Sequence, residues 1–328
     1  MTYWEDENFI LDHAPNSAWV RFRQAASAHI YLLLMDVVHP HAVQRRYCVS
    51  ICAIFKNEAP YLREWIEFHR IVGVEHFYLY NNNSEDGFRE VLAPYLREGL
   101  VTLIEWPYRQ AQMKAYWDCV ARFRTETRWL GFIDLDEFVV PRKTDTIYEV
   151  LQPFEKNRPA VIFYWRVFGS SGRMKRNPHG LVTEDFTVCW PKFDDIGKVF
   201  YNTAYEPAPD FYKNVSMHHT QWARCGRFLL PPVNMDGHVC VGNRHVIDDR
   251  DVPIQINHYF TKSYAEYHAT KQTRGDVMYE KNPHDEAYFF LHEEKCTTVD
   301  YSAYRFLICL KNAMHASEGD ERRESTYG

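Results

Sequence analysis

Apolar and polar residues alternate along the first 140 positions in a pattern that predicts strands and helices in turn. Apolar runs rich in β-branched residues predict strands, and the segments between them repeat apolar residues at helical spacing, as Leu62, Trp65 and Ile66 do before Gly73. Such alternation with short connections predicts an α/β fold, with a parallel sheet flanked by helices. We expect strands at 47–55, 74–80, 100–106 and 129–134, and helices at 60–72, 88–96 and 110–123.

The pattern becomes irregular after Pro141, and residues 176–253 show no clear period. A helix is expected to begin at Ser263, because its spacing to Glu266 is typical of a capping box. The further elements expected here are a strand at 161–168, a loop at 169–172, a strand at 254–260 and helices at 263–274 and 301–314. The chain is divided into a leader of short strands and turns (1–45), a main domain (46–280), and a C-terminal helix with a charged, disordered tail (281–328).

Three carboxylates follow the apolar run that begins at Trp129: Asp134, Asp136 and Glu137. In open α/β sheets, ligands bind at the carboxyl ends of the strands. Asp134 and Asp136 are two positions apart, so in an extended chain they point the same way and could hold Mg²⁺ or Mn²⁺ with a diphosphate. The alternative is strand-end capping and salt bridges, and for Glu137 we favour pairing with a cation. A second Asp-x-Asp at 249–251 is interpreted as a solvated turn.

Composition limits the class of protein. The 328 residues include 46% hydrophobic residues and carry a formal net charge of −6, which argues against a general nucleic-acid binder. None of the eight cysteines forms a C-x-x-C pair, so we expect no disulfide framework, no structural zinc, and a reducing, cytoplasmic location. The N-terminus does not read as a signal peptide, and the most apolar stretch, 30–35, is too short to span a bilayer.

A series of motifs occurs in order between residues 48 and 275. They are Lys56-Asn57-Glu58, 61–69, 73–86, Gln112 with 118–119, 129–138, 168–172, and 258–263 with 274–275. Taken together, these residues resemble a glycosyltransferase of the GT-A fold, in the family 92 or DUF23-like group related to family 2. The resemblance implies a Rossmann-like, mostly parallel sheet flanked by helices, with a nucleotide-sugar half at 46–140 and an irregular acceptor half at 141–280.

The resemblance also implies a reaction, the transfer of a sugar from a nucleotide diphosphate donor. Mn²⁺, or Mg²⁺, would bridge the diphosphate, and in inverting enzymes a carboxylate deprotonates the acceptor hydroxyl. UDP-galactose is the donor to try first, and the expected acceptor is a glycan or a lipid-linked glycan, which leaves peripheral membrane association open. The alternatives are a nucleotidyltransferase, which the glycine-free loop 56–60 argues against, and a carbohydrate-binding protein that has lost catalysis.

By the same resemblance, Asp136 is the expected metal ligand, and Asp134 binds the ribose, or the metal through water. His258, a late histidine at the end of a strand, would complete the metal site, since imidazole suits Mn²⁺. Lys262 and Arg274 are candidates for neutralising the leaving diphosphate. Solvation at the surface explains these two cations almost as well.

The nucleotide pocket is expected at the ends of the first two strands and at the helix that follows them. Its candidate residues are Lys56, Glu58, Asn82, Asn83, Asp86 and Gln112. An asparagine amide offers both a donor and an acceptor to a base edge. The alternatives are plain turn chemistry for the asparagines and an interaction with the helix dipole for Glu58.

The general base must be a carboxylate within hydrogen-bond reach of the acceptor hydroxyl. We choose Glu184, with Asp185 beside it, because both follow the loop at 168–172 in the expected acceptor region. The rival carboxylates are Asp194, Asp195 and Asp236, and His218 with His219 is a candidate pair for lining the site.

Overall fold

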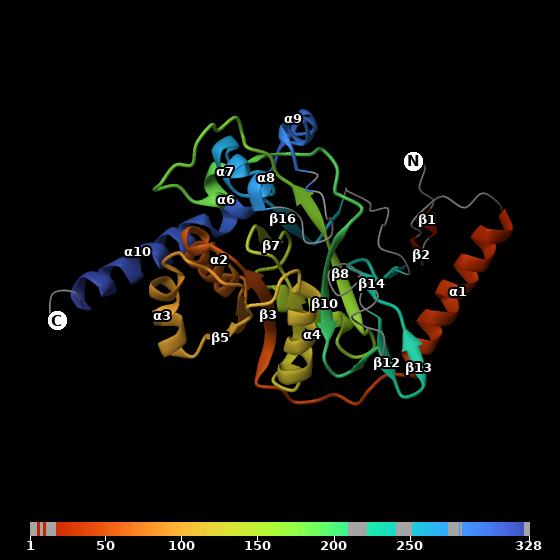
Figure 1. Cartoon of the computed structure of the whole chain (residues 1–328). Coiled ribbons are helices and arrows are strands. Elements are labelled where there is room, and N and C mark those ends of the chain that lie inside the picture. The colour runs from red at the N-terminus through yellow and green to blue at the C-terminus, as the bar shows by residue number, and fades with distance from the viewer. Residues whose placement is uncertain are drawn as a thin grey trace.

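The structure is a computed structural model that describes residues 5–6, 9–10, 18–208, 222–240, 251–274, 282 and 284–324. Helices pack around a central sheet (Figure 1). The helices are α1 (Ala18–Val37), α2 (Ala59–Ile71), α3 (Phe88–Glu98), α4 (Gln112–Phe123), α5 (Ile147–Leu151), α6 (Val182–Asp185), α7 (Tyr264–Ala269), α8 (Lys271–Arg274), α9 (Glu286–Glu294) and α10 (Leu307–Glu324), with 3-10 turns η1 (Gln152–Phe154) and η3 (Ser302–Phe306).

The large sheet has the strand order β1-β2-β15-β14-β8-β10-β6-β3-β4-β5, with β16 pairing β7 and β8. The strands are β1 (Glu5–Asp6), β2 (Phe9–Ile10), β3 (Tyr47–Phe55), β4 (His76–Asn81), β5 (Val101–Glu105), β6 (Thr127–Phe132), β7 (Glu137–Pro141), β8 (Ala160–Val167), β9 (Val188–Cys189), β10 (Gly197–Asn202), β11 (Glu206–Pro207), β12 (Ala223–Cys225), β13 (Phe228–Leu230), β14 (Val233–Asn234), β15 (Val239–Cys240), β16 (Ile254–His258) and β17 (Thr298–Val299).

The apolar runs of the first half form the parallel part of the sheet. β5, β4, β3 and β6 lie side by side in parallel, with Ile51 of β3 opposite Phe77 of β4 and Gly131 of β6. β4 is buried along its whole length, as its continuous apolar sequence predicts. Beyond β6 the sheet becomes mixed, because β10 runs antiparallel to both β6 and β8. The α/β fold class is confirmed, with a parallel core and a less regular second half.

The helix signals that were read from the sequence occur where they were expected. Pro60 lies in the first turn of α2, where a missing N–H costs no hydrogen bond. After α2 the chain turns at Gly73, whose φ of +93° favours glycine. Ser263 and Glu266 form the predicted capping box, but α7 ends at Ala269 and α8 is a separate short helix.

Three parts of the chain differ from the prediction. The leader contains a helix of 20 residues, α1, rather than only short strands and turns. α9 lies in a segment for which no element was predicted, and α10 continues to Glu324 through most of the tail that was expected to be disordered. α1 is rich in Ala and Leu, and α10 is rich in Ala, Leu, Glu and Arg, all of which are strong helix formers.

Helix α1 lies at one margin of the molecule, and α10 lies at the opposite margin (Figure 1). Ala28 and Met35 of α1 are buried, whereas its exposed large apolar side chains recur at helical spacing along another face. These exposed residues are Trp19, Phe22, Ile30, Leu33 and Val37. None of the described helices is long and apolar enough to cross a membrane.

Candidate active site

Asp134 and Asp136 lie in a tight turn between β6 and β7. The N–H of Glu137 donates to the carbonyl of Asp134 at 3.1 Å and closes the turn. The indole Nε1 of Trp65 donates to the carbonyls of Asp134 and Glu137, at 3.1 and 2.8 Å. The expectation that the chain is extended through the two aspartates is therefore wrong, because β6 ends at Phe132 and a turn follows it.

Asp134 is held by side chains from β10 and α4. Its Oδ2 lies 2.7 Å from Nζ of Lys198, and its Oδ1 accepts from Nε2 of Gln112 at 2.8 Å and from the hydroxyl of Tyr116 at 3.0 Å. Lys198 is fully buried, and the antiparallel pairing of β10 with β6 brings it beneath the turn. The structure thus brings together Gln112 and Asp134, two of the predicted donor-binding residues.

Glu137 shares the same lysine. Its Oε2 lies 3.3 Å from Nζ of Lys198 and accepts from the N–H of Asp134 at 2.9 Å. Burial raises the pKa of Glu137 above its ordinary value, against the opposing charge of Lys198. Glu137 therefore pairs with a cation, as we favoured from the sequence, and helps to fix the turn.

Asp136 faces a different set of partners. Nζ of Lys271 in α8 lies 2.6 Å from its Oδ2, and Nε2 of His258 lies 3.9 Å from its Oδ1. Strand pairing brings the histidine here, because β16 runs antiparallel to β7 with His258 opposite Glu137. The N–H of Tyr259 also donates to the carbonyl of Asp136 at 2.8 Å.

The charge states of Asp136 and His258 follow from burial and from the neighbouring cations. Burial disfavours the ionised form of Asp136, but Lys271, His258 and Lys262 outweigh it and hold the pKa of Asp136 below its ordinary value. Burial lowers the pKa of His258 to about 3. At neutral pH the pair is therefore an ionised carboxylate and a neutral imidazole, which are the forms that bind a metal ion.

The spacing of this pair also fits one divalent ion. With metal–ligand bonds of about 2.1 Å, two atoms bound to one ion lie at most about 4.2 Å apart. The 3.9 Å between Oδ1 of Asp136 and Nε2 of His258 is short enough for one ion to contact both atoms. Asp134 does not join them in a compact set of three. Within the described ranges, three ligand atoms lie within 4.8 Å of one another only at His292, Glu293 and Cys296.

A further cation, Lys262, lies beside this pair. Its Nζ is 3.8 Å from Oε2 of Glu58 and 3.5 Å from the ring centroid of Tyr61. Glu58 immediately precedes α2, and Lys262 follows β16, so the ends of two distant strands meet here. The predicted donor-binding residues Glu58 and Lys262 thus lie next to the predicted metal ligands.

Asn82 and Asp86 have contacts that organise the loop after β4. Nδ2 of Asn82 donates to the carbonyl of Trp106 at 2.6 Å. Oδ2 of Asp86 accepts from the N–H of Ala59 at 2.8 Å, at the start of α2. These bonds give both residues a structural role, and their part in donor binding stays a prediction.

The remaining donor-binding candidates are exposed or only partly described. Lys56 and Asn83 are exposed, and the φ of +56° at Asn83 fits the turn interpretation. Arg274 is the last residue of α8. His218, His219 and Asp249 lie outside the described residues, whereas Asp251 of the second Asp-x-Asp is exposed and pairs with Lys143, as a solvated turn would.

Glu184 and Asp185 lie in α6 and pair with cations elsewhere. Oε1 of Glu184 is 2.5 Å from Nζ of Lys311 in α10, and Oδ1 of Asp185 is 2.6 Å from the guanidinium of Arg173. The buried carboxylate of Glu64 fixes α6 by accepting two of its N–H groups. The structure therefore does not place the two candidate bases in contact with the metal-ligand pair, and their catalytic role stays a prediction.

Sequence reasoning missed the two lysines that neutralise the aspartates. Lys198 is a lone charge inside an apolar run, Val199 to Tyr201 following it directly, and such a charge indicates a buried partner of opposite sign. Lys271 carries no comparable signal, because it lies in a polar helical segment. Its position depends on the way α8 folds over the turn.

The sequence profile of glycosyltransferase family 92 matches residues 45–274. The chain belongs to glycosyltransferase family 92. The resemblance found from the motifs is thereby confirmed, and the matched range contains Gln112, the Asp134–Asp136 turn, His258 and Lys271.

Named relatives match shorter segments. A family 92 protein of Oryza sativa subsp. japonica is 34% identical over 146 residues, which cover 44% of this chain and 25% of the rice protein. The beta-1,4-galactosyltransferase galt-1 of Caenorhabditis elegans is 34% identical over 120 residues (32% of this chain, 28% of that protein). The galactan beta-1,4-galactosyltransferase GALS3 of Arabidopsis thaliana is 34% identical over 122 residues (34% and 24%). The chain thus matches about a quarter of the length of these relatives.

Among solved structures, S. aureus TarS 1–349 in complex with UDP-GlcNAc aligns with 48% of this chain and 46% of its own, at 11% identity and a TM-score of 0.33.

Proposed function

We propose that this chain transfers a sugar from a UDP-sugar to a hydroxyl of a glycan or a lipid-linked glycan, and that the reaction depends on a divalent metal. The observation that supports this most is the pair of an ionised Asp136 and a neutral His258, 3.9 Å apart, with Lys271 and Lys262 beside it. Membership in family 92 supports glycosyl transfer as the reaction.

Asp136 and His258 would hold Mn²⁺ or Mg²⁺, which supplies positive charge against the donor diphosphate. Lys271 now neutralises Asp136 at 2.6 Å. When that carboxylate takes a metal as its partner, the ammonium of Lys271 can turn toward the phosphates. Together with Lys262 it would stabilise the negative charge that develops on the leaving UDP.

Asp134 would face the nucleoside part of the donor. Its side chain is 26% exposed although Lys198, Gln112 and Tyr116 hold it, so a ligand hydroxyl could reach it. A carboxylate fixed in this way can accept from a ribose hydroxyl without losing its charge partner. UDP-galactose is the first donor to try, because galt-1 and GALS3 are named as galactosyltransferases.

The proposed reaction inverts the anomeric centre, with Glu184 or Asp185 as the base. Burial raises the pKa of the Asp185 carboxyl, which makes it a better proton acceptor. Replacement of the true base, as Glu184→Gln or Asp185→Asn, should lower kcat and leave the affinity for UDP-sugar unchanged. NMR of the product would show the opposite anomeric configuration to the donor.

We also propose that α1 associates peripherally with the cytoplasmic face of a membrane, where lipid-linked acceptors occur. Its exposed Trp19, Phe22, Ile30, Leu33 and Val37 give the apolar face that such binding requires. Sedimentation with anionic vesicles tests this. Ile30→Asp with Leu33→Asp should abolish co-sedimentation without changing UDP binding, and binding that persists in this variant would contradict the proposal.

The main test is calorimetric binding of a UDP-sugar panel, with and without Mn²⁺, to the wild type and to Asp136→Asn, followed by an assay of UDP release. Binding that needs Mn²⁺ and is lost in the variant, together with acceptor-dependent UDP release, would support the transferase. Binding without turnover for any acceptor would favour a carbohydrate-binding protein. No binding of any UDP species by the folded protein would overturn the UDP assignment.

A further inference from the structure

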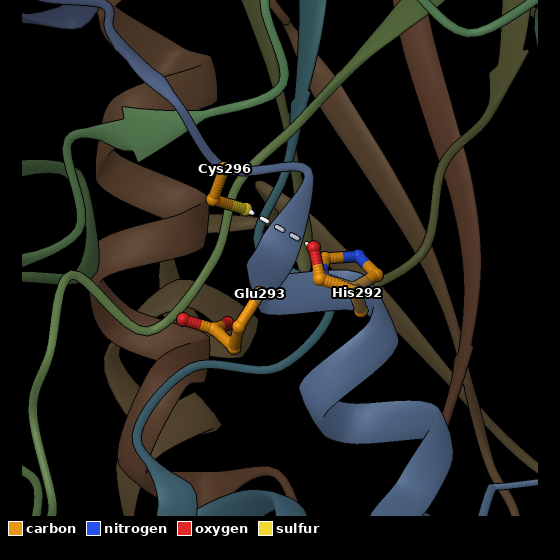
Figure 2. A group of neighbouring side chains, drawn as sticks. All are labelled: His292, Glu293 and Cys296. Carbon is orange, nitrogen blue, oxygen red and sulfur yellow. Dashed lines mark hydrogen bonds between the residues drawn. The ribbon is translucent and has the colours of Figure 1, made fainter.

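Three potential metal ligands converge at the end of α9, away from the Asp136 pair. His292 and Glu293 are in the last turn of the helix, and Cys296 follows it. One ligand atom from each residue lies within 4.8 Å of the others. Figure 2 shows the three side chains gathered around this helix end, with Sγ of Cys296 3.5 Å from the carbonyl of His292.

Among the described residues, the His292 side chain has no hydrogen-bond partner. It is 94% buried, since its exposed fraction is 6%. Within the described residues, neither Nδ1 nor Nε2 of His292 has a hydrogen-bond partner. The ring stacks on Phe260, with centroids 5.3 Å apart, and lies against Trp190 at 5.1 Å. A buried imidazole without partners loses about 1–3 kcal/mol of solvation, so the site favours a ligand that binds nitrogen.

The surrounding residues hold the other two ligands in place. Glu293 accepts from the N–H and the hydroxyl of Ser170, at 2.8 and 2.7 Å, and from the hydroxyl of Thr261 at 3.2 Å. A Cβ on Gly169 would lie 2.6 Å from Sγ of Cys296 and 2.7 Å from Oε1 of Glu293. The sulfur and the carboxylate therefore both lie close against the backbone at Gly169, where a larger residue would clash with them.

We propose that His292, Glu293 and Cys296 bind a Zn²⁺ ion. Nitrogen, oxygen and sulfur donors in one small site suit zinc, whereas Mn²⁺ and Mg²⁺ prefer the oxygen-rich surroundings of Asp136. The sequence predicted no zinc site because it lacks paired cysteines, and here the three ligands come from the end of one helix.

Zinc binding at this site must release one proton. An unperturbed cysteine thiol has a pKa of about 8.5 and carries its proton at neutral pH, whereas zinc binds the thiolate. A neutral imidazole binds zinc without losing a proton. The Zn–S bond replaces the S–H bond, and the proton goes to the buffer.

A bound zinc ion would stabilise the contact of α9 with two other segments, the loop after β8 and residues 260–261. Glu293 already contacts Ser170 in the loop after β8 and Thr261 beside Lys262, and His292 packs on Phe260. An ion at this point would fix α9 against both segments. The inference does not depend on the proposed transferase activity, because it concerns a structural site.

The test is zinc binding by the full chain after treatment with a chelator. Competition against a chromogenic zinc chelator should give one tight site per chain and at least one proton released per zinc. Cys296→Ala and His292→Phe should each weaken binding by at least about tenfold, whereas Cys309→Ala, which removes an exposed thiol of α10, should bind as the wild type does.

Co²⁺ substitution gives a second readout. The sulfur-to-cobalt absorption should be present in the wild type and in Cys309→Ala and absent in Cys296→Ala. Urea unfolding of each metal-free variant shows that it is folded, and Cys296→Ser serves if the alanine variant is not. A wild type without a stoichiometric zinc site, or equal affinity in the wild type and both ligand variants, would overturn the proposal.

Discussion

The turn at Asp134–Asp136 and the end of α9 both gather potential metal ligands, but they satisfy their polar atoms in opposite ways. At the turn, each aspartate already meets a lysine, Lys198 at 2.7 Å and Lys271 at 2.6 Å. At α9, the ring nitrogens of His292 have no hydrogen-bond partner in the part of the chain that the structure describes. A metal at the turn must replace an existing charge partner, whereas a metal at α9 replaces none for the histidine.

We therefore expect the two sites to differ in how tightly they bind a metal ion. Exchange of one positive partner for another gains little free energy, so we expect metal binding at Asp136 to be weak until a donor diphosphate adds its own ligands. His69 gives an internal reference for a satisfied buried histidine. Its Nδ1 donates to the carbonyl of Trp65 at 2.8 Å, and its Nε2 accepts from the N–H of Val139 at 3.1 Å.

The largest loss of stability is expected from Lys198→Met, because this substitution removes the counter-charge of both Asp134 and Glu137. Removal of one partner from a buried ion pair costs roughly 3–5 kcal/mol of the free energy of unfolding, and Lys198 pairs with both Asp134 and Glu137. Urea unfolding measures this loss. Lys143→Met, which breaks the exposed pair with Asp251, should cost at most about 1 kcal/mol. Equal losses in the two variants would show that Lys198 is not a structural counter-charge.

Asp136→Asn tests the exchangeable partner. The amide cannot replace the carboxylate as a metal ligand, so we expect turnover of the UDP-sugar to fall at least about 100-fold, or roughly 3 kcal/mol in the activation free energy. The matched control is Asp251→Asn in the second Asp-x-Asp, which should leave turnover unchanged. Similar losses in both variants would argue that neither motif binds the metal.

Local signals in the sequence predicted much of this site. The strand at 47–55 agrees residue for residue with β3, and the capping box at Ser263 is present. Such features depend on neighbours along the chain, so periodicity and cap chemistry reveal them. The approach of His258 to Asp136 was expected only from the family resemblance, and the antiparallel register of β7 and β16 is its physical cause.

The features that could not be predicted depend on long-range packing. The register of β10 against β6 places Lys198 under the turn, and no local pattern fixes that register. The sequence did not predict the turn, because an apolar run that ends in Asp134 has the same residue pattern whether the strand continues or the chain turns. The sequence did not reveal the α9 cluster, because its residues become a possible metal site only when the fold brings Gly169 and Phe260 beside them.

The pH dependence of stability should report on the satisfied histidine. Burial lowers the pKa of His69 to about 3, below the value near 6.5 in the unfolded chain. The unfolded state therefore binds more protons in this range, so stability is lost as pH falls below 6.5. His69 alone should account for about 2–3 kcal/mol between pH 6.5 and 4.5. Urea unfolding of the wild type and His69→Gln at several pH values measures it. An unchanged pH slope in the variant would contradict the assignment.

Substitution by phenylalanine should separate the two histidines. His69→Phe leaves the N–H of Val139 without its acceptor and should cost about 1–3 kcal/mol. His292→Phe, measured without metal, removes two unsatisfied nitrogens and should be neutral or slightly stabilising. Thermal unfolding in the presence of a chelator compares them. Destabilisation of similar size in both would mean that His292 has partners in solution that satisfy its ring.

The smallest change is expected in ligand affinity when Phe260 is replaced, because its ring contacts one residue from each cluster. Nζ of Lys271 lies 4.7 Å from its centroid on the side of Asp136, and the imidazole of His292 stacks on it. Phe260→Leu removes a cation–π contact worth about 0.5–1 kcal/mol, so UDP-sugar affinity should fall about two- to fivefold. Zinc affinity should fall as well, because His292 loses the ring that orients it. Phe228 of β13 makes a similar contact with Arg227, and Phe228→Leu should change neither affinity. If Phe260→Leu weakened the binding of only the UDP-sugar or only zinc, the two clusters would be independent, and the shared ring would not couple them.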